Sequence, residues 1–114
     1  MKKFIVLLRE PDGRTGKPEE QVQKSQAAKW HEWFEKHRQS GNFIGGSALS
    51  LNGKMIKGID AEVVNEIHRI GTEIVGGYLL VQANNIDEAV EIARGLPVYQ
   101  VGGYAEVREL RVDG

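Results

Sequence analysis

The sequence contains no cysteine, which excludes disulfide bonds, thiolate metal sites and a cysteine nucleophile together. Long apolar runs are also missing, and no segment approaches the ~18 consecutive apolar residues of a membrane span. The apolar run at residues 4–8 is too short for the core of a signal peptide and leads directly into charged residues. We therefore expect a soluble, cytoplasmic protein with no membrane partner.

An excess of one charge is missing as well. Fifteen Lys and Arg residues balance 16 Asp and Glu residues, and the two signs are interleaved along the chain, so we expect no nucleic-acid partner. The three histidines lack the H-x-H, H-x-x-x-H and HExxH spacings of metal sites, and we predict no metal or other cofactor. The length of 114 residues suits a single domain, residues 1–114.

Hydrophobic patterning predicts most of the regular elements. Residues 3–9, 72–83 and 104–112 are short apolar or alternating segments bounded by turn residues, which is typical of strands. A long helix is expected from Pro18 to about Ser40, where Gly41 ends it. A second helix is expected within 84–97, with Asn84 or Asn85 near its N-cap. Its predicted buried stripe consists of Ile86, Ala89, Val90 and Ala93.

Two segments in the middle of the chain differ in how clearly they can be interpreted. Residues 42–58 are predicted to form a β-hairpin, because Asn52-Gly53 supplies the positive φ angles that tight turns require. Residues 59–72 are harder to assign. Val63, Val64, Ile67 and Ile70 could line a short helix, but we favour a loop or irregular turn.

The resulting order is strand, helix, hairpin, strand, helix, strand. It predicts a ferredoxin-like α+β fold in which both helices cover one face of an antiparallel sheet. Along 72–83, alternation places Val75 on the side of Leu79 and Ile74 on the side of Tyr78. Both faces of this strand are then apolar, so we expect a homodimer that packs sheet face against sheet face.

The segment EIVGGYLLVQANNIDEAVEIARGLPVYQVGGYAEVREL, together with MKKFIVLLRE and GNFIGGSAL, resembles the YCII-related family, in particular its DGPF-motif group. The resemblance extends from residue 3 to about residue 112. It implies a dimeric α/β barrel built from ferredoxin-like protomers. Its implication for activity is limited, because most members have no established function and a few relatives are enzymes that act on small aromatic compounds.

The sequence departs from this family at its characteristic motifs. The DGPF motif falls on Asn65-Glu66-Ile67-His68, and only Glu73 matches, at the position of the glutamate downstream of the motif. Trp30 occupies the position of a helix histidine that works with an aspartate in other YCII relatives. The resemblance therefore does not carry over the His-Asp dyad.

Three glycine doublets precede predicted strand segments: Gly45-Gly46, Gly76-Gly77 and Gly102-Gly103. A phosphate-binding loop would require such glycines at the start of a helix, which is not their predicted context. They could instead mark bends or close packing in the sheet. A third alternative is that the missing side chains leave space for a ligand.

Helical spacing places an aromatic face on the long helix, with Gln26, Trp30, Trp33 and His37 on one side. His37 could act as a general base, or it could simply suit the last turn of the helix. Glu73 precedes a buried strand, where an apolar wall would raise its pKa, or it could pair with Lys54, Lys57 or Arg69.

We therefore predict a homodimeric, small-molecule-binding protein with a pocket between the long helix and the sheet. If it is an enzyme, we expect cofactor-independent acid/base chemistry on a small aromatic or carboxylate compound, with Glu73 or His37 moving the proton. The alternative is a non-catalytic homodimeric assembly or regulatory protein. The candidate pocket residues are Gln26, Trp30, Trp33, His37, Ser47, Glu73 and Tyr78.

Overall fold

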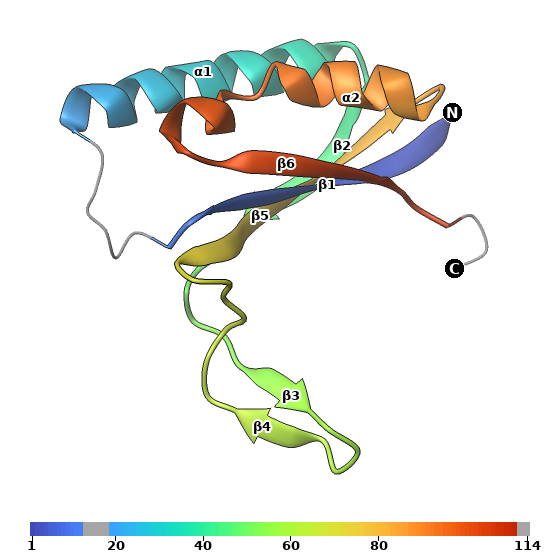
Figure 1. The fold of residues 1–114 in the computed structure, drawn as a ribbon. Helices are drawn as coiled ribbons and strands as arrows, with labels where there is room; N and C mark the ends of the chain where they lie inside the picture. The colour runs from blue at the N-terminus through green and yellow to red at the C-terminus, as the bar shows by residue number, and fades with distance from the viewer. Residues whose placement is uncertain (13–18, 112–114) are drawn as a thin grey trace.

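The computed structural model describes residues 1–12 and 19–111, and its elements follow the predicted order closely (Figure 1). No helix in these two ranges is long and apolar enough to cross a membrane. The elements are β1 (Lys2–Pro11), α1 (Glu20–Gln39), β2 (Phe43–Ala48), β3 (Met55–Lys57), β4 (Glu62–Val64), β5 (Glu73–Ala83), α2 (Ile86–Arg94), the 3₁₀ helix η1 (Pro97–Val101) and β6 (Tyr104–Glu109).

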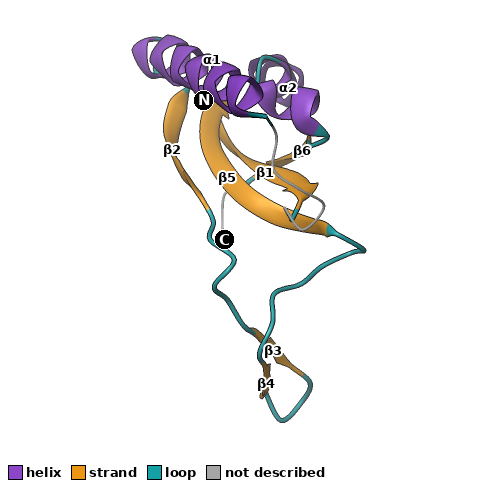
Figure 2. Cartoon of the chain, turned by 90° about the vertical axis from the view of Figure 1, so that its left-hand side faces the viewer, coloured by secondary structure: helices purple, strands orange, loops and turns teal. Residues whose placement is uncertain are grey.

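Four strands form an antiparallel sheet in the order β2-β5-β1-β6. Both α-helices cover the same face of this sheet, and no helix of residues 1–12 and 19–111 lies on the other face (Figures 1 and 2). We call the uncovered side the open face. The predicted α+β, ferredoxin-like fold is therefore confirmed.

The core lies between the helices and the two central strands. Phe4 pairs directly with Val81, and Val6 pairs with Leu79, so that their side chains share the helix-covered face. Phe4, Val6 and Val81 are 0% exposed. Alternation in β1 thus directs every second apolar residue into the core, as expected for a strand between two neighbours.

The predicted long helix is confirmed with nearly the expected bounds. It ends at Gln39, and Gly41 follows with φ of 81°, the left-handed conformation that glycine adopts without strain. Trp33 and His37 are its only buried residues. Trp30 and Phe34 are partly buried and pack against the core cluster, so the aromatic face does point towards the sheet.

The second helix begins as predicted, because the Asn85 side chain accepts a hydrogen bond from the Glu88 amide at 2.9 Å. Its predicted buried stripe is partly wrong. Ala89 and Ala93 are buried, but Ile86 and Val90 are 42% and 39% exposed. The buried row instead continues through Ile92 and Leu96, because the helix packs along the i, i+3, i+4 and i+7 positions counted from Ala89.

The predicted hairpin across Asn52-Gly53 is wrong. The strand before this turn, β2, pairs with β5, and the strand after it, β3, pairs with β4. Residues 59–72 do not form a helix, and they contribute β4 within otherwise irregular backbone. Residues 50–70 therefore form an arm, which projects from the sheet on the side of the open face (Figure 1).

A β-bulge in β5 changes which side chains face the helices. The pairing of β1 with β5 shifts between Leu8 and Arg9, so Leu8 lies opposite Gly77 and Arg9 lies opposite Val75. Gly76 is the additional residue. As a result, Val75 lies on the open face and Ile74 is buried, the reverse of the predicted alternation.

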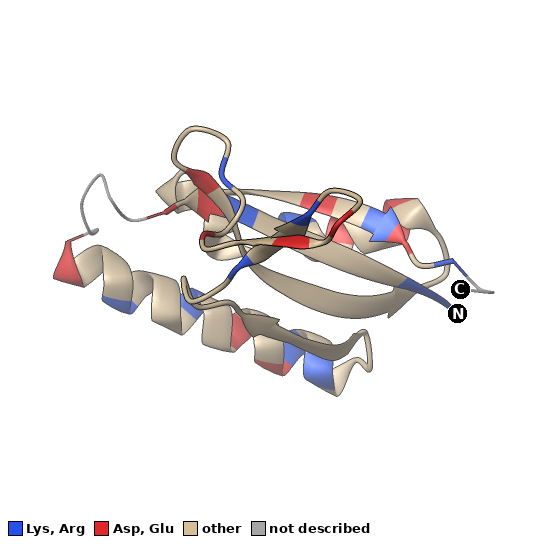
Figure 3. Ribbon diagram, turned by 90° about the horizontal axis from the view of Figure 1, so that it is seen from below, with Lys and Arg blue, Asp and Glu red and all other residues tan. Residues whose placement is uncertain are grey.

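The open face combines apolar and charged side chains. Leu7 pairs with Tyr78 and Ile5 pairs with Leu80, and all four are partly exposed. Viewed from this side, acidic and basic residues are interspersed along β6 and the arm rather than gathered by sign (Figure 3). Both sides of β5 are thus apolar, as the sequence predicted, but only one side is covered within this chain.

Candidate functional site

A cavity of about 340 Å³ lies between α1 and the β2–β5 side of the sheet. This size falls at the small end of the range for ligand sites and suits a compact molecule. Residues from α1, β1, β2 and β5 contribute to its walls. They are Leu8, Glu10, Trp30, Phe34, Gly46, Ser47, Ala48, Gly76, Gly77, Tyr78 and Leu79.

Three glycines of the β2 and β5 doublets, Gly46, Gly76 and Gly77, line this cavity. A β-carbon at Gly76 would overlap the Glu10 carboxylate, so the bulge glycine leaves the space that this side chain occupies. A β-carbon at Gly77 would lie 3.0 Å from the Ser47 carbonyl oxygen, closer than ordinary packing allows. The doublets therefore serve both close strand packing and cavity formation, two of the three alternatives that the sequence left open.

The third doublet has a different role. Gly102 ends η1 with φ of 84°, and a β-carbon at Gly103 would overlap the Val98 side chain and lie 3.0 Å from the Arg9 carbonyl oxygen. These glycines let the chain turn tightly from η1 into β6. They belong to the packing of the fold and not to the cavity.

Glu10 is the charged residue of the cavity. It continues the row of Phe4, Val6 and Leu8 on the helix-covered side of β1, and its side chain is half-buried. Burial raises the pKa of the Glu10 carboxyl group. Within residues 1–12 and 19–111, no hydrogen bond or ion pair satisfies its carboxylate.

Aromatic rings form the wall of the cavity opposite the glycines. Trp30 and Phe34 are stacked, with ring centroids 5.6 Å apart and planes 28° from parallel. Phe34 also meets Phe43 edge to face at 5.2 Å, which supports the wall from β2. The wall is thus rigidly packed, and it offers a flat apolar surface to a ligand.

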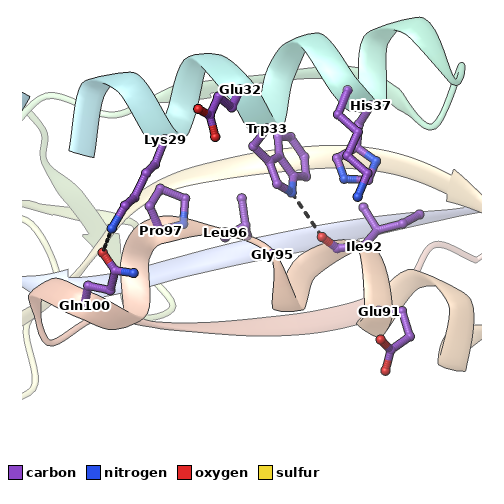
Figure 4. A pocket seen from close by; sticks show the side chains of 11 residues that line it. Lys29, Glu32, Trp33, His37, Glu91, Ile92, Gly95, Leu96, Pro97 and Gln100 are labelled. Atoms are coloured by element: carbon purple, nitrogen blue, oxygen red, sulfur yellow. Dashed lines mark hydrogen bonds between the residues drawn. The ribbon is translucent and has the colours of Figure 1, made fainter. Parts of the chain in front are cut away.

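His37 and Trp33 line a different hollow, of about 240 Å³, between α1 and the segment formed by α2 and η1 (Figure 4). The Trp33 indole donates a hydrogen bond to the Ile92 carbonyl oxygen at 3.0 Å. His37 Nδ1 is buried without a hydrogen-bond partner in the part of the chain that the structure describes. Burial, and then the charge of Lys36, lower the pKa of His37.

Gln26 lies near the same hollow, and its side chain is hydrogen-bonded to η1. Its side-chain amide donates to Gln100 of η1 at 3.3 Å, and Lys29 donates to the same acceptor at 2.5 Å. These bonds tie the exposed half of α1 to η1. They account for an amide on the aromatic side of the helix without requiring a ligand.

Glu73 lies at the start of β5, on the same side as Val75, which is the open face. The Tyr104 hydroxyl donates a hydrogen bond to its carboxylate, and this bond raises the pKa of Tyr104. Arg69 was one of the cations predicted as a partner for Glu73. It forms an ion pair with the buried Asp12 instead, at 3.3 Å. Glu73 is therefore separated by the sheet from the aromatic face of α1.

The structure brings only some of the predicted site residues together. Trp30, Ser47 and Tyr78 line the cavity, whereas Trp33 and His37 line the hollow between the helices. Glu10 was not among the site residues predicted from the sequence. The alternation in β1 indicates it, because this pattern places residue 10 on the core side after three apolar residues.

A YCII-related domain matches residues 4–112 of the chain. Among curated proteins, no match was found. The matched range covers both helices and all four strands of the sheet except the first two residues of β1. The resemblance predicted from the sequence is therefore confirmed.

Proposed function

Because the chain belongs to the YCII-related family, we propose that it binds a small molecule in the cavity between α1 and the sheet. One observation carries this proposal: a half-buried carboxylate, that of Glu10, faces a cavity and has no partner in the described chain. The carboxylate is therefore free to bind a ligand, and a titratable group with a shifted pKa in a cleft is typical of a functional site.

The same carboxylate supports cofactor-independent acid/base chemistry. A raised pKa brings a glutamate closer to the pH at which it can both accept and release a proton. In this proposal Glu10 moves the proton and the Trp30 wall positions a small aromatic compound. Glu73 and His37, the residues predicted for proton transfer, face other surfaces and would act only on a ligand bound there.

We also propose that the protein is a homodimer through the open face, as a dimeric α/β barrel requires. Ile5, Leu7 and Leu80 form a partly exposed apolar strip on the two central strands of this face. A second copy related by two-fold symmetry would cover this strip with the same residues. Light scattering after size-exclusion chromatography should give twice the mass of the chain, and a monomeric mass would contradict the dimer.

The binding proposal is tested by indole N–H signals in NMR spectra. Small aromatic compounds that raise the melting temperature in a thermal-shift screen are titrated into labelled protein. The Trp30 signal should move more than the Trp33 signal, since the Trp33 ring borders the other hollow and lies 6.5 Å from the Trp30 ring. The signals are assigned with the Trp33→Phe variant.

A matched variant locates the site. Ala48→Trp places a large side chain at the exposed β2 wall of the cavity and should abolish binding without lowering the melting temperature by more than a few degrees. Binding retained in this variant would contradict the proposed site. A screen without any hit that moves Trp30 would favour the alternative of a non-catalytic assembly protein.

A further inference from the structure

The cavity carries charge of one sign only. Among the described residues that line it, Glu10 is the one charged side chain, and Lys, Arg and His are absent. The hollow between the helices differs, because Lys29 and Lys36 there accompany Glu32 and Glu91. A ligand entering the cavity therefore meets a carboxylate that no cation among the described lining residues neutralises.

An uncompensated carboxylate discriminates between ligands by charge. A ligand carboxylate would face a like charge in a partly desolvated site, where repulsion is stronger than in water. A ligand ammonium group would supply the missing counter-charge and hydrogen-bond donors to Glu10. The electrostatics of the cavity thus favour a cation and disfavour an anion.

The aromatic wall acts in the same direction. Trp30 is the side chain type that attracts cations most strongly through its ring face, and it borders the same cavity as Glu10. Its ring is stacked on Phe34, and both rings line the same cavity as the carboxylate. One small site therefore offers an anion for a charged group and ring surface for an apolar group.

We propose that the ligand of this cavity is a small alkylamine that carries an aromatic ring, and that it binds in its ammonium form. The ammonium group pairs with the Glu10 carboxylate, and the ring lies against Trp30 and Phe34. This inference rests on the proposed function, since it names the ligand class of that site. The inference excludes carboxylate compounds, one of the two substrate classes predicted from the sequence.

Three probes of nearly equal size test the inference: 2-phenylethylamine, 2-phenylethanol and phenylacetate. Each is titrated at pH 7.5 into the full-length protein, and the dissociation constant is read from the Trp30 indole signal. We expect the amine to bind about tenfold or more tightly than the alcohol, the ratio that one charge-assisted hydrogen bond of roughly 1.5–3 kcal/mol provides. Phenylacetate should bind more weakly than the alcohol.

Variants identify the group responsible. Glu10→Gln should bring the amine and the alcohol to within about threefold of each other, since the charge is lost and the shape is kept. Gly76→Ala displaces the carboxylate without removing it and should lower the same ratio, so the inference stays testable if either variant folds poorly. Glu106→Gln, which removes a carboxylate on the open face, should leave the ratio unchanged.

The outcomes separate this inference from the proposal beneath it. If phenylacetate binds as tightly as the amine, or if Glu10→Gln leaves the ratio unchanged, the inference is overturned while the cavity remains a binding site. If none of the probes moves the Trp30 signal and the screen finds no other compound that does, the proposed function fails and the inference fails with it.

Discussion

The glycine doublet of β2 permits a comparison between adjacent residues. Gly46 has φ of 144°, and a β-carbon there would overlap the Tyr78 carbonyl oxygen and lie 2.9 Å from the Leu79 Cα atom. At Gly45 the nearest atom would be a Leu80 methyl carbon at 3.8 Å, an ordinary contact. We therefore predict that Gly46→Ala is strongly destabilising and that Gly45→Ala is tolerated.

The size of the difference follows from two contributions at Gly46. Holding an alanine in this backbone region costs about 1–3 kcal/mol. The clash with main-chain atoms, which cannot rotate away, adds about 1–3 kcal/mol as overpacking. Gly45→Ala meets no clash, and the loss of freedom in its unfolded chain changes stability by less than about 1 kcal/mol. The two variants should therefore differ by at least about 2 kcal/mol in the free energy of unfolding.

Urea unfolding followed by tryptophan fluorescence measures this difference. Both variants and the wild type are compared at one protein concentration, because the proposed homodimer would make stability depend on concentration. Unchanged m-values confirm that the midpoints report stability. Equal midpoints for the two variants would refute the close approach of β2 to β5 at Gly46.

Three further predictions concern single side chains. Burial lowers the pKa of His37 in the folded chain. The free energy of unfolding should therefore fall as the pH drops below about 6.5 and should level off below the folded pKa. In urea unfolding between pH 7.5 and 5.5, the His37→Asn variant should lose less stability than the wild type. The hydrogen bond to Glu73 raises the pKa of Tyr104, and Glu73→Gln should lower this pKa towards about 10 in an absorbance titration at 295 nm. Trp33→Phe leaves the Ile92 carbonyl oxygen without its indole donor and should cost about 1–3 kcal/mol in urea unfolding, whereas an unchanged midpoint would contradict this bond.

Local patterns in the sequence were sufficient for the elements that are defined locally. The β1 segment is an apolar run with a turn after it, α1 has proline before it and Gly41 after it, and α2 has the Asn85 cap. Each of these signals lies within or beside the element it specifies. Their order along the chain then predicted the ferredoxin-like sheet, because few arrangements bury all of these apolar faces.

The errors concern pairings between distant residues. Asn52-Gly53 is a strong local turn signal, yet β2 pairs with β5 some 30 residues away, where Gly46 and Gly77 allow the backbones to approach closely. The bulge at Gly76 is likewise a property of the pairing with β1, and it reverses the sides of Ile74 and Val75. A single sequence encodes these contacts but does not reveal the partner strand.

The candidate site was predicted in part for the same reason. Trp30 reaches the cavity because helix periodicity directs it towards the sheet. Ser47 and Tyr78 border the cavity, but they pair with each other on the open face, so strand periodicity does not direct their side chains into it. Glu10 escaped attention because a charged residue at the end of an apolar run is typical of a strand leaving the core. Alternation in β1 places residue 10 on the core side, and the glycine across the bulge leaves the space that its carboxylate occupies there.

The arm joins the sheet at two closely spaced points. At one end, the Leu49 amide donates to the Gly76 carbonyl oxygen at 2.8 Å, and at the other, Ile70 and Glu73 exchange two backbone hydrogen bonds of 3.0 Å. Both ends are thus anchored at the start of β5, and β3 and β4 pair only with each other. The arm can therefore change in length or sequence without altering the register of the four strands. It is a suitable place to insert a foreign peptide, and sequence divergence among relatives is expected there.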